Sequence, residues 1–122
     1  MTMRRAIGFI LRPESGENVS RHANEMEREA TQLGFSWIAT FYADLRAEAN
    51  YIRMISRLIR EDADAVFLPS AVHLDERDIQ VLATHTDVYC LGERLRHTVH
   101  REDDAGAESS RRVVAMDSGT AS

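Results

Sequence analysis

Four polar side chains that could bind a small molecule each come just after a stretch of apolar residues. They are Arg12, Asp44, Ser70 and His73. If those stretches are parallel strands, their carboxyl ends meet at one edge of the sheet, where ligands of such folds gather. An arginine, a carboxylate, a hydroxyl and an imidazole together supply both donors and acceptors to a polar ligand. One interpretation is therefore a small-molecule sensor with its pocket at these strand ends.

Two histidines, His97 and His100, suggest metal binding because they are three residues apart. Three acids follow them, namely Glu102, Asp103 and Asp104. Imidazoles one helical turn apart chelate divalent ions, but this spacing does not match the known zinc ligand sets. His22 and His85 have polar, helix-like surroundings and are expected at the surface. We therefore predict no metal site and no cofactor.

Phosphate-binding and thiol chemistry have little support in the sequence. The loop after residues 6–11 has one glycine, Gly16, and neither G-x-G-x-x-G nor G-x-x-x-x-G-K occurs. Cys90 lies in an apolar stretch, where a thiol usually behaves as a small buried hydrophobe. As the single cysteine it forms no internal disulfide. A reducing, cytoplasmic location is the simplest interpretation.

Three arginines, Arg53, Arg57 and Arg60, form a basic ridge because they are spaced four and three residues apart on a predicted helix. Three acids flank the ridge, namely Glu48, Glu61 and Asp62. The formal net charge of the chain is −5, which disfavours non-specific and sequence-specific binding of DNA. This balance favours a solvated face or a contact with another protein over a contact with phosphate.

The elements that must position these residues alternate between strands and helices, which is typical of an α/β domain. Apolar stretches predict strands at residues 6–11, 35–42, 65–68 and 87–91. Residues 13–18 have the composition of a loop. We predict a doubly wound, mainly parallel sheet of four to five strands with helices on both faces. No apolar run approaches the ~20 residues of a membrane span, so no membrane association is expected.

Helical spacing predicts which residues of the helices face the core. The first helix, from Ser20, has four candidates: Ala23, Met26, Ala30 and Leu33. The second has another four: Ile52, Ile55, Leu58 and Ile59. After Gly92 the periodicity fades, so residues 93–122 are predicted to be a polar tail, partly or wholly disordered. Its apolar cluster, which contains Val113, Val114 and Met116, either adds a strand to a sheet edge or a partner, or is a short exposed patch.

The order of these elements resembles the N-terminal catalytic domain of serine recombinases, the resolvase/invertase family. The resemblance rests on residues 6–10, 32–35, 42–44 and 63–74, and covers residues 4–92. It implies a resolvase-like domain whose strand-end serine attacks a DNA phosphodiester while arginines neutralise the phosphate. At the positions that it implies for the tyrosine, arginine and serine of this site stand Phe9, Leu11 and Pro13.

Pro13 cannot act as a nucleophile. The family's arginine-rich motif after the third strand is also replaced in this sequence. Its aspartate and two arginines correspond to Val72, His73 and Glu76. Of the acidic positions, Asp44 keeps a family-like place. The resemblance therefore implies a scaffold that has kept the fold and lost the reaction.

We therefore expect a catalytically inactive resolvase-like domain that acts as a protein-interaction or regulatory module. Its partner is an unidentified protein, and a homodimer is compatible with the sequence. The candidate contact residues are Arg53, Arg57, Arg60, Val113, Val114 and Met116. An alternative is a DNA recombinase or nuclease with a displaced nucleophile, because a shift of two residues brings Ser15 to the serine position. Its remaining candidates are Arg12, Asp44 and Arg53. The small-molecule sensor is the other alternative.

Overall fold

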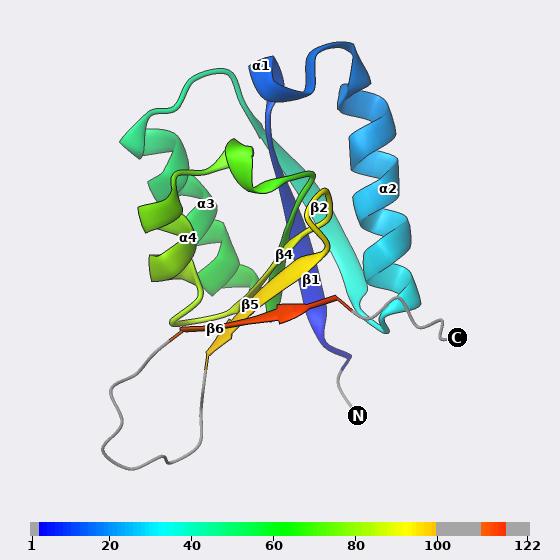
Figure 1. Cartoon of the computed structure of the whole chain (residues 1–122). Helices are drawn as coiled ribbons and strands as arrows, with labels where there is room; N and C mark the ends of the chain where they lie inside the picture. Colours follow the sequence, from blue (N-terminus) through cyan, green and yellow to red (C-terminus); the bar gives the residue numbers. More distant parts are fainter. Residues whose placement is uncertain (1–2, 100–110, 117–122) are drawn as a thin grey trace.

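The computed structural model describes residues 3–99 and 111–116, which form one six-stranded sheet with helices packed on it (Figure 1). The strands are β1 (Arg5–Leu11), β2 (Ser36–Ala43), β3 (Ala65–Leu68), β4 (Asp87–Cys90), β5 (Leu95–Val99) and β6 (Arg111–Ala115). The α-helices are α1 (Arg12–Ser15), α2 (Val19–Gln32), α3 (Glu48–Glu61) and α4 (Glu76–Leu82). Two short 3₁₀ turns, η1 (Gly16–Asn18) and η2 (Ala71–His73), complete the elements. No helix in the described ranges is long and apolar enough to cross a membrane.

The sheet is mixed, with strand order β2-β1-β3-β4-β5-β6. The first four strands run parallel, whereas β4, β5 and β6 pair antiparallel. The α/β class is thus confirmed, but the prediction of a mainly parallel sheet of four to five strands is met only in part. A tight turn joins β4 to β5, with Arg94 at φ 56°. So short a connection can only reverse the chain, because a parallel pair needs a long crossover.

Two strands lie in the region predicted to be a polar tail. β5 has three polar residues between Leu95 and Val99, and β6 pairs with it in a register that places His97 opposite Val113. Ladder hydrogen bonds, rather than a long apolar run, build this edge of the sheet. Met116 packs against the core on the α2 side. The rest of the predicted tail, residues 100–110 and 117–122, lies outside the described residues.

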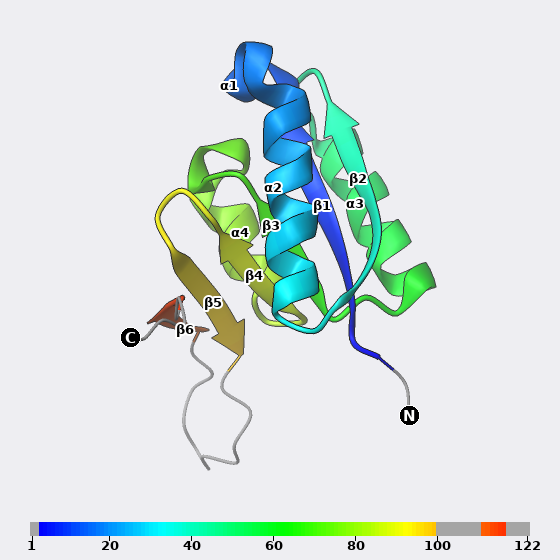
Figure 2. The ribbon, with the colours of Figure 1, turned by 90° about the vertical axis from the view of Figure 1, so that its right-hand side faces the viewer.

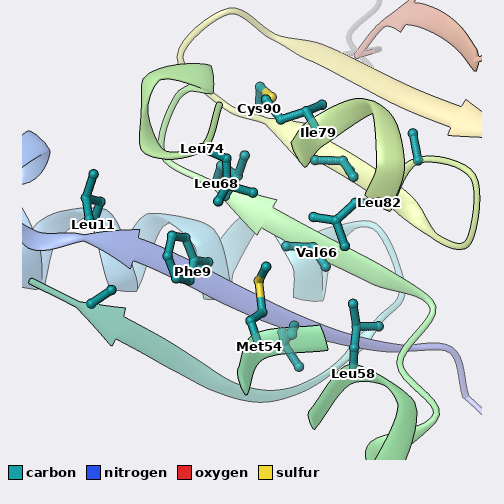
Figure 3. Close-up of a cluster of buried hydrophobic side chains, with 14 residues drawn as sticks. Phe9, Leu11, Met54, Leu58, Val66, Leu68, Leu74, Ile79, Leu82 and Cys90 are labelled. Atoms are coloured by element: carbon teal, nitrogen blue, oxygen red, sulfur yellow. The ribbon is translucent and has the colours of Figure 1, made fainter. Parts of the chain in front are cut away.

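Helices cover both faces of the sheet, with α2 on one face and α3 and α4 on the other (Figures 1 and 2). The central strand β1 serves both layers because its side chains alternate. Phe9 packs in the cluster beneath α3 and α4 (Figure 3), while Ile10 packs in the cluster beneath α2. Only glycine fits at position 8 without displacing its neighbours, because a Cβ there would lie 2.7 Å from the ring of Trp37 and 2.9 Å from Met26 Cε.

The predicted core face of α2 is largely right and that of α3 is partly wrong. In α2, Met26 and Ala30 are buried as expected, whereas Leu33, directly after the helix, is exposed. In α3 the buried positions are Met54 and Leu58, flanked by two partly buried residues, Tyr51 and Ile55. Ile52 and Ile59 are 53% and 74% exposed, because at 100° per residue they lie on the flank of this stripe.

The segment 13–18 is a continuation of regular structure rather than the predicted loop. Pro13 lies in the first turn of α1, where its missing N–H costs nothing. Gly16 follows with φ 59°, a conformation that favours glycine, and leads through η1 into α2. This compact turn buries Ser15 at the end of α1.

Candidate functional site

The loops that follow β1 and β3 diverge to opposite faces of the sheet, and His73 bridges the gap between them. The chain leaves β1 toward α2 and leaves β3, through η2, toward α4. The backbone N–H of Leu11 donates a hydrogen bond of 2.9 Å to Nδ1 of His73. Since Nδ1 is the acceptor, the neutral ring carries its proton on Nε2. His73 thereby ties together the carboxyl ends of two neighbouring parallel strands.

His73 is 2% exposed, and this burial governs its protonation. Burial first, and the charge of His22 second, lower the pKa of His73 from 6.5 to about 4. Arg46 lowers that pKa further, while Glu14 opposes the trend. The imidazole is therefore neutral at pH 7 and acts as a hydrogen-bonding group.

Ser15, the displaced nucleophile of the recombinase interpretation, lies in a hydrogen bond with His22. Ser15 Oγ and His22 Nδ1 are 2.7 Å apart, which is the spacing of a nucleophile and its base. However, Ser15 is 3% exposed, so its hydroxyl is not presented to a macromolecular substrate. The rings of His22 and His73 meet edge to face at 6.5 Å. The sequence alone places His22 at the surface, and it is half-buried instead.

The other predicted site residues separate into two groups. Arg12 Nε lies 3.4 Å from Asp44 Oδ1, and the Arg12 guanidinium stacks 4.7 Å over the ring of Tyr42. In the described residues, no hydrogen bond or ion pair joins this pair to Ser15. Ser70 accepts a hydrogen bond from the N–H of Val72 and so begins η2, next to His73. The structure thus brings together Arg12 with Asp44, and Ser70 with His73, but not all four.

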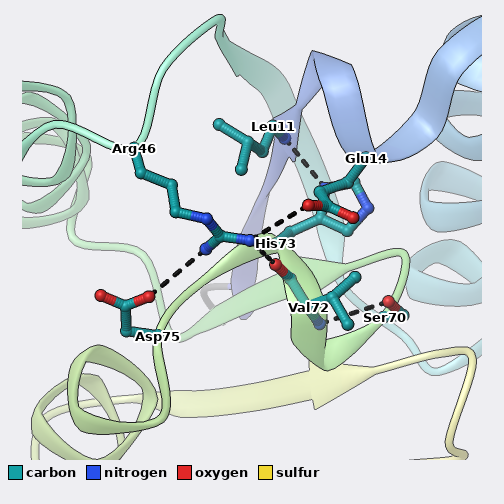
Figure 4. A network of polar contacts seen from close by, with 7 residues as sticks. All are labelled: Leu11, Glu14, Arg46, Ser70, Val72, His73 and Asp75. Atoms are coloured by element: carbon teal, nitrogen blue, oxygen red, sulfur yellow. Dashed lines mark hydrogen bonds and ion pairs between the residues drawn. The ribbon is translucent and has the colours of Figure 1, made fainter.

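Arg46, which the sequence did not single out, links three elements at the strand ends (Figure 4). Its guanidinium contacts Glu14 at 3.2 Å and Asp75 at 3.4 Å, and donates to the carbonyl of Val72. These partners belong to α1, η2 and the residue before α4. Contacts across about 30 positions leave no local signal in a sequence, which explains why Arg46 was missed.

Beside this network lies a cavity of about 420 Å³, here called the strand-end cavity. Its walls include three apolar residues, Phe9, Leu11 and Leu74, and two polar ones, Tyr51 and Arg77. His73, Arg46, Asp75 and Asp78 also line it. Burial and the nearby Asp78 raise the pKa of Tyr51, so its hydroxyl stays protonated. Of the four residues predicted to bind a ligand, His73 is the one that lines this cavity.

A second cavity, of about 440 Å³, lies between β2 and α3 and is here called the arginine groove. Four arginines line it, namely Arg12, Arg53, Arg57 and Arg60. The prediction of a basic ridge on this helix is extended by Arg12, which arrives from the end of β1. Arg57 is not fully solvated, because it lies 5.2 Å over the ring of Phe41 and 3.1 Å from Glu61.

The candidates for metal and thiol chemistry stand apart from both cavities. Within residues 3–99 and 111–116, no group of three or more His, Cys, Asp or Glu side chains could hold a metal ion. His97 lies buried in β5, while His100 and the acids after it lie outside the described residues. Cys90 is buried, and burial first, then Glu93 and Glu76, raise its pKa to about 12.

Comparison of the chain with protein families, with curated proteins and with solved structures found no match.

Proposed function

We propose that this chain is a non-enzymatic interaction module that binds an acidic, extended segment of a partner protein in the arginine groove. The observation that carries the proposal is the convergence of four arginines, from α1 and α3, on one groove along β2. We further propose that the domain is resolvase-like in architecture and has kept that fold without its reaction.

The charge of the groove favours an anionic partner. Two of the four guanidiniums are balanced by carboxylates, Arg12 by Asp44 and Arg57 by Glu61. Arg53 contacts the neutral amide oxygen of Asn50 at 3.4 Å and, among the described residues, makes no ion pair. Among the described residues, Arg60 has no hydrogen bond or ion pair. The groove therefore carries an excess of positive charge on a chain whose net charge is −5.

The shape of the site favours an extended segment. Among the described strands, β2 pairs with β1 alone, so it forms one edge of the sheet. An edge strand presents unpaired N–H and C=O groups that can accept a further strand. Thr40, Phe41 and Tyr42 line the groove at this edge. A segment lying there would pair its backbone with β2 and direct alternate acidic side chains toward the arginines.

Other occupants fit less well. Single-stranded nucleic acid needs open aromatic faces for base stacking, but bases would have to compete with the guanidiniums of Arg12 and Arg57, which already stack on the rings of Tyr42 and Phe41. A second copy of the chain, related by two-fold symmetry, would place the two sets of arginines against each other. The burial of Ser15 and the proline at position 13 support a role without catalysis.

Fluorescence anisotropy with a labelled peptide tests the proposal. The peptide alternates glutamate and threonine over eight residues, the length of β2. A lysine–threonine peptide and an oligothymidylate serve as the other two probes. The double variant Arg53→Glu/Arg60→Glu removes the two cations that make no ion pair in the described part of the chain. Its matched control, Arg21→Glu/Arg28→Glu, makes the same change of charge at exposed positions of α2.

The acidic peptide should bind, and the groove variant should weaken it by about tenfold or more, whereas the α2 variant should leave it nearly unchanged. Equal weakening by both variants would reduce the effect to net charge and overturn the proposal. So would an absence of binding at about 1 mM peptide. Tighter binding of the oligothymidylate, lost in the groove variant, would replace the protein partner with a nucleic acid.

A further inference from the structure

The strand-end cavity lies at the position where sheets of this type admit ligands. It opens beyond the carboxyl ends of β1 and β3, between which the chain changes from one face of the sheet to the other. Its volume of about 420 Å³ lies in the range that accommodates small organic molecules. Arg77, at its mouth, does not line the arginine groove, so the two sites can be tested separately.

The cavity has an apolar interior. Phe9 and Leu11 from β1 and Leu74 from the segment before α4 contribute to its lining, and all three belong to the buried core beneath α3 and α4. Leu45 and Val81 add apolar surface nearer the solvent. A ligand with a hydrocarbon body would cover this surface and remove it from water.

Hydrogen-bond donors line the same cavity. Among the described residues, the hydroxyl of Tyr51 makes one hydrogen-bond contact, a long one of 3.5 Å to the carbonyl of Asp78. His73 carries its proton on Nε2, because its Nδ1 accepts from Leu11. Arg77 is exposed and makes no hydrogen bond or ion pair with any described residue. These donors suit a ligand that brings acceptor oxygens.

We propose that the strand-end cavity binds a small monocarboxylic acid, with its hydrocarbon body on Phe9, Leu11 and Leu74 and its carboxylate on Arg77. Two arginines and two aspartates line the cavity, so their formal charges cancel, and this balance favours a single carboxylate over a doubly charged phosphate ester. The second arginine of the cavity, Arg46, is already neutralised by Glu14 and Asp75. A single unpaired guanidinium matches a single carboxylate, which it can hold by two parallel hydrogen bonds.

Titrations followed by ¹H–¹⁵N correlation spectra of the full chain test this proposal. The acidic probes are benzoate and hexanoate, and benzamide is the neutral probe of matched shape. Arg77→Gln removes the cation while keeping a polar side chain of similar reach. Arg28→Gln, on the opposite face of the sheet, is the matched control. Agreement of the spectra of both variants with that of the unaltered chain establishes that they fold.

Benzoate and hexanoate should shift the backbone signals of Leu11 and of the segment from Leu74 to Asp78. Arg77→Gln should weaken both acids by about tenfold, the loss expected for a charge-assisted hydrogen bond, and Arg28→Gln should not. Benzamide should bind more weakly than benzoate. Equal affinities for benzamide and benzoate, unchanged binding in Arg77→Gln, or no shifts up to about 10 mM acid would each overturn the proposal.

Discussion

Acid should destabilise this domain through one side chain, His73. In the folded chain its Nδ1 accepts the N–H of Leu11, and protonation would turn that acceptor into a second donor. The ring is 2% exposed, so water does not screen the added charge. In the unfolded chain the same histidine titrates with its ordinary pKa of 6.5, whereas in the folded chain burial, assisted by His22, lowers the pKa to about 4.

The two pKa values fix both the sign and the size of the effect. Between pH 6.5 and 4 the unfolded chain binds a proton that the folded chain does not. The stabilisation by neutral His73 is therefore complete above about pH 6.5, falls as the pH falls, and levels off below about 4. At about 1.4 kcal/mol for each pH unit, the free energy of unfolding should decrease by about 3 kcal/mol over this interval.

Urea unfolding at a series of pH values from 7.5 to 4 measures this decrease. The variant His73→Asn keeps an acceptor oxygen near Leu11 but cannot titrate, so its decrease should be smaller by about 3 kcal/mol. His85→Asn, at an exposed position, is the control and should follow the unaltered chain. Identical pH profiles for the unaltered chain and His73→Asn would refute the reasoning. An NMR titration that placed the pKa of folded His73 at 6.5 or above would refute it too.

Two substitutions and one labelling experiment probe the core. Gly8→Ala should lower the free energy of unfolding by about 1–3 kcal/mol, measured by urea denaturation, because its new methyl would collide with Trp37 and Met26. Cys90 should react with a thiol reagent at pH 8 only at the rate of global unfolding, and at once in urea, since its pKa is raised to about 12 and it is fully buried. Thr86→Val should leave the melting temperature unchanged or raise it, because the Thr86 hydroxyl is buried and has no hydrogen-bond partner in the described part of the chain. A clear fall in melting temperature would point to a partner for that hydroxyl.

The alternation of strands and helices was predictable because apolar runs and helical spacing are local signals. Residues 65–68, for example, are buried throughout and form β3 with the predicted bounds. The core face of α3 was harder, because the exposed Ile52 and Ile59 are spaced as regularly along the helix as the residues that are buried. Only the packing of α3 on β1 decides which of the two stripes faces the core, and this tertiary contact cannot be recognised from the local spacing of residues.

The structure brings together some of the four predicted site residues, but not all of them. Arg12 and Asp44 meet, as expected for residues that follow neighbouring parallel strands. The Ser70 hydroxyl instead accepts a hydrogen bond from the backbone N–H of Val72, which is a frequent use of serine at the start of a turn. The Arg46 network and the pairing of Ser15 with His22 depend on how α1 folds back after β1. In residues 13–18, Pro13 and Gly16 suit the start and the end of a short helix, but a helix of one turn is too short to show helical spacing of apolar residues.

The interior position of β1 has a consequence for synthesis on the ribosome. β1 is synthesised before both of the strands that pair with it, β2 and β3. The second of these, β3, begins at Ala65, more than 50 residues after β1 ends at Leu11. At about 5–20 residues per second, that interval lasts about 3–10 s. During it an apolar strand that is later buried on both faces has at most one neighbour. Hairpins form within about 10 μs, so the interval before β3 is synthesised is far longer than the time that strands need to pair. A chaperone or another nascent chain can therefore bind the free edge of β1 before β3 does.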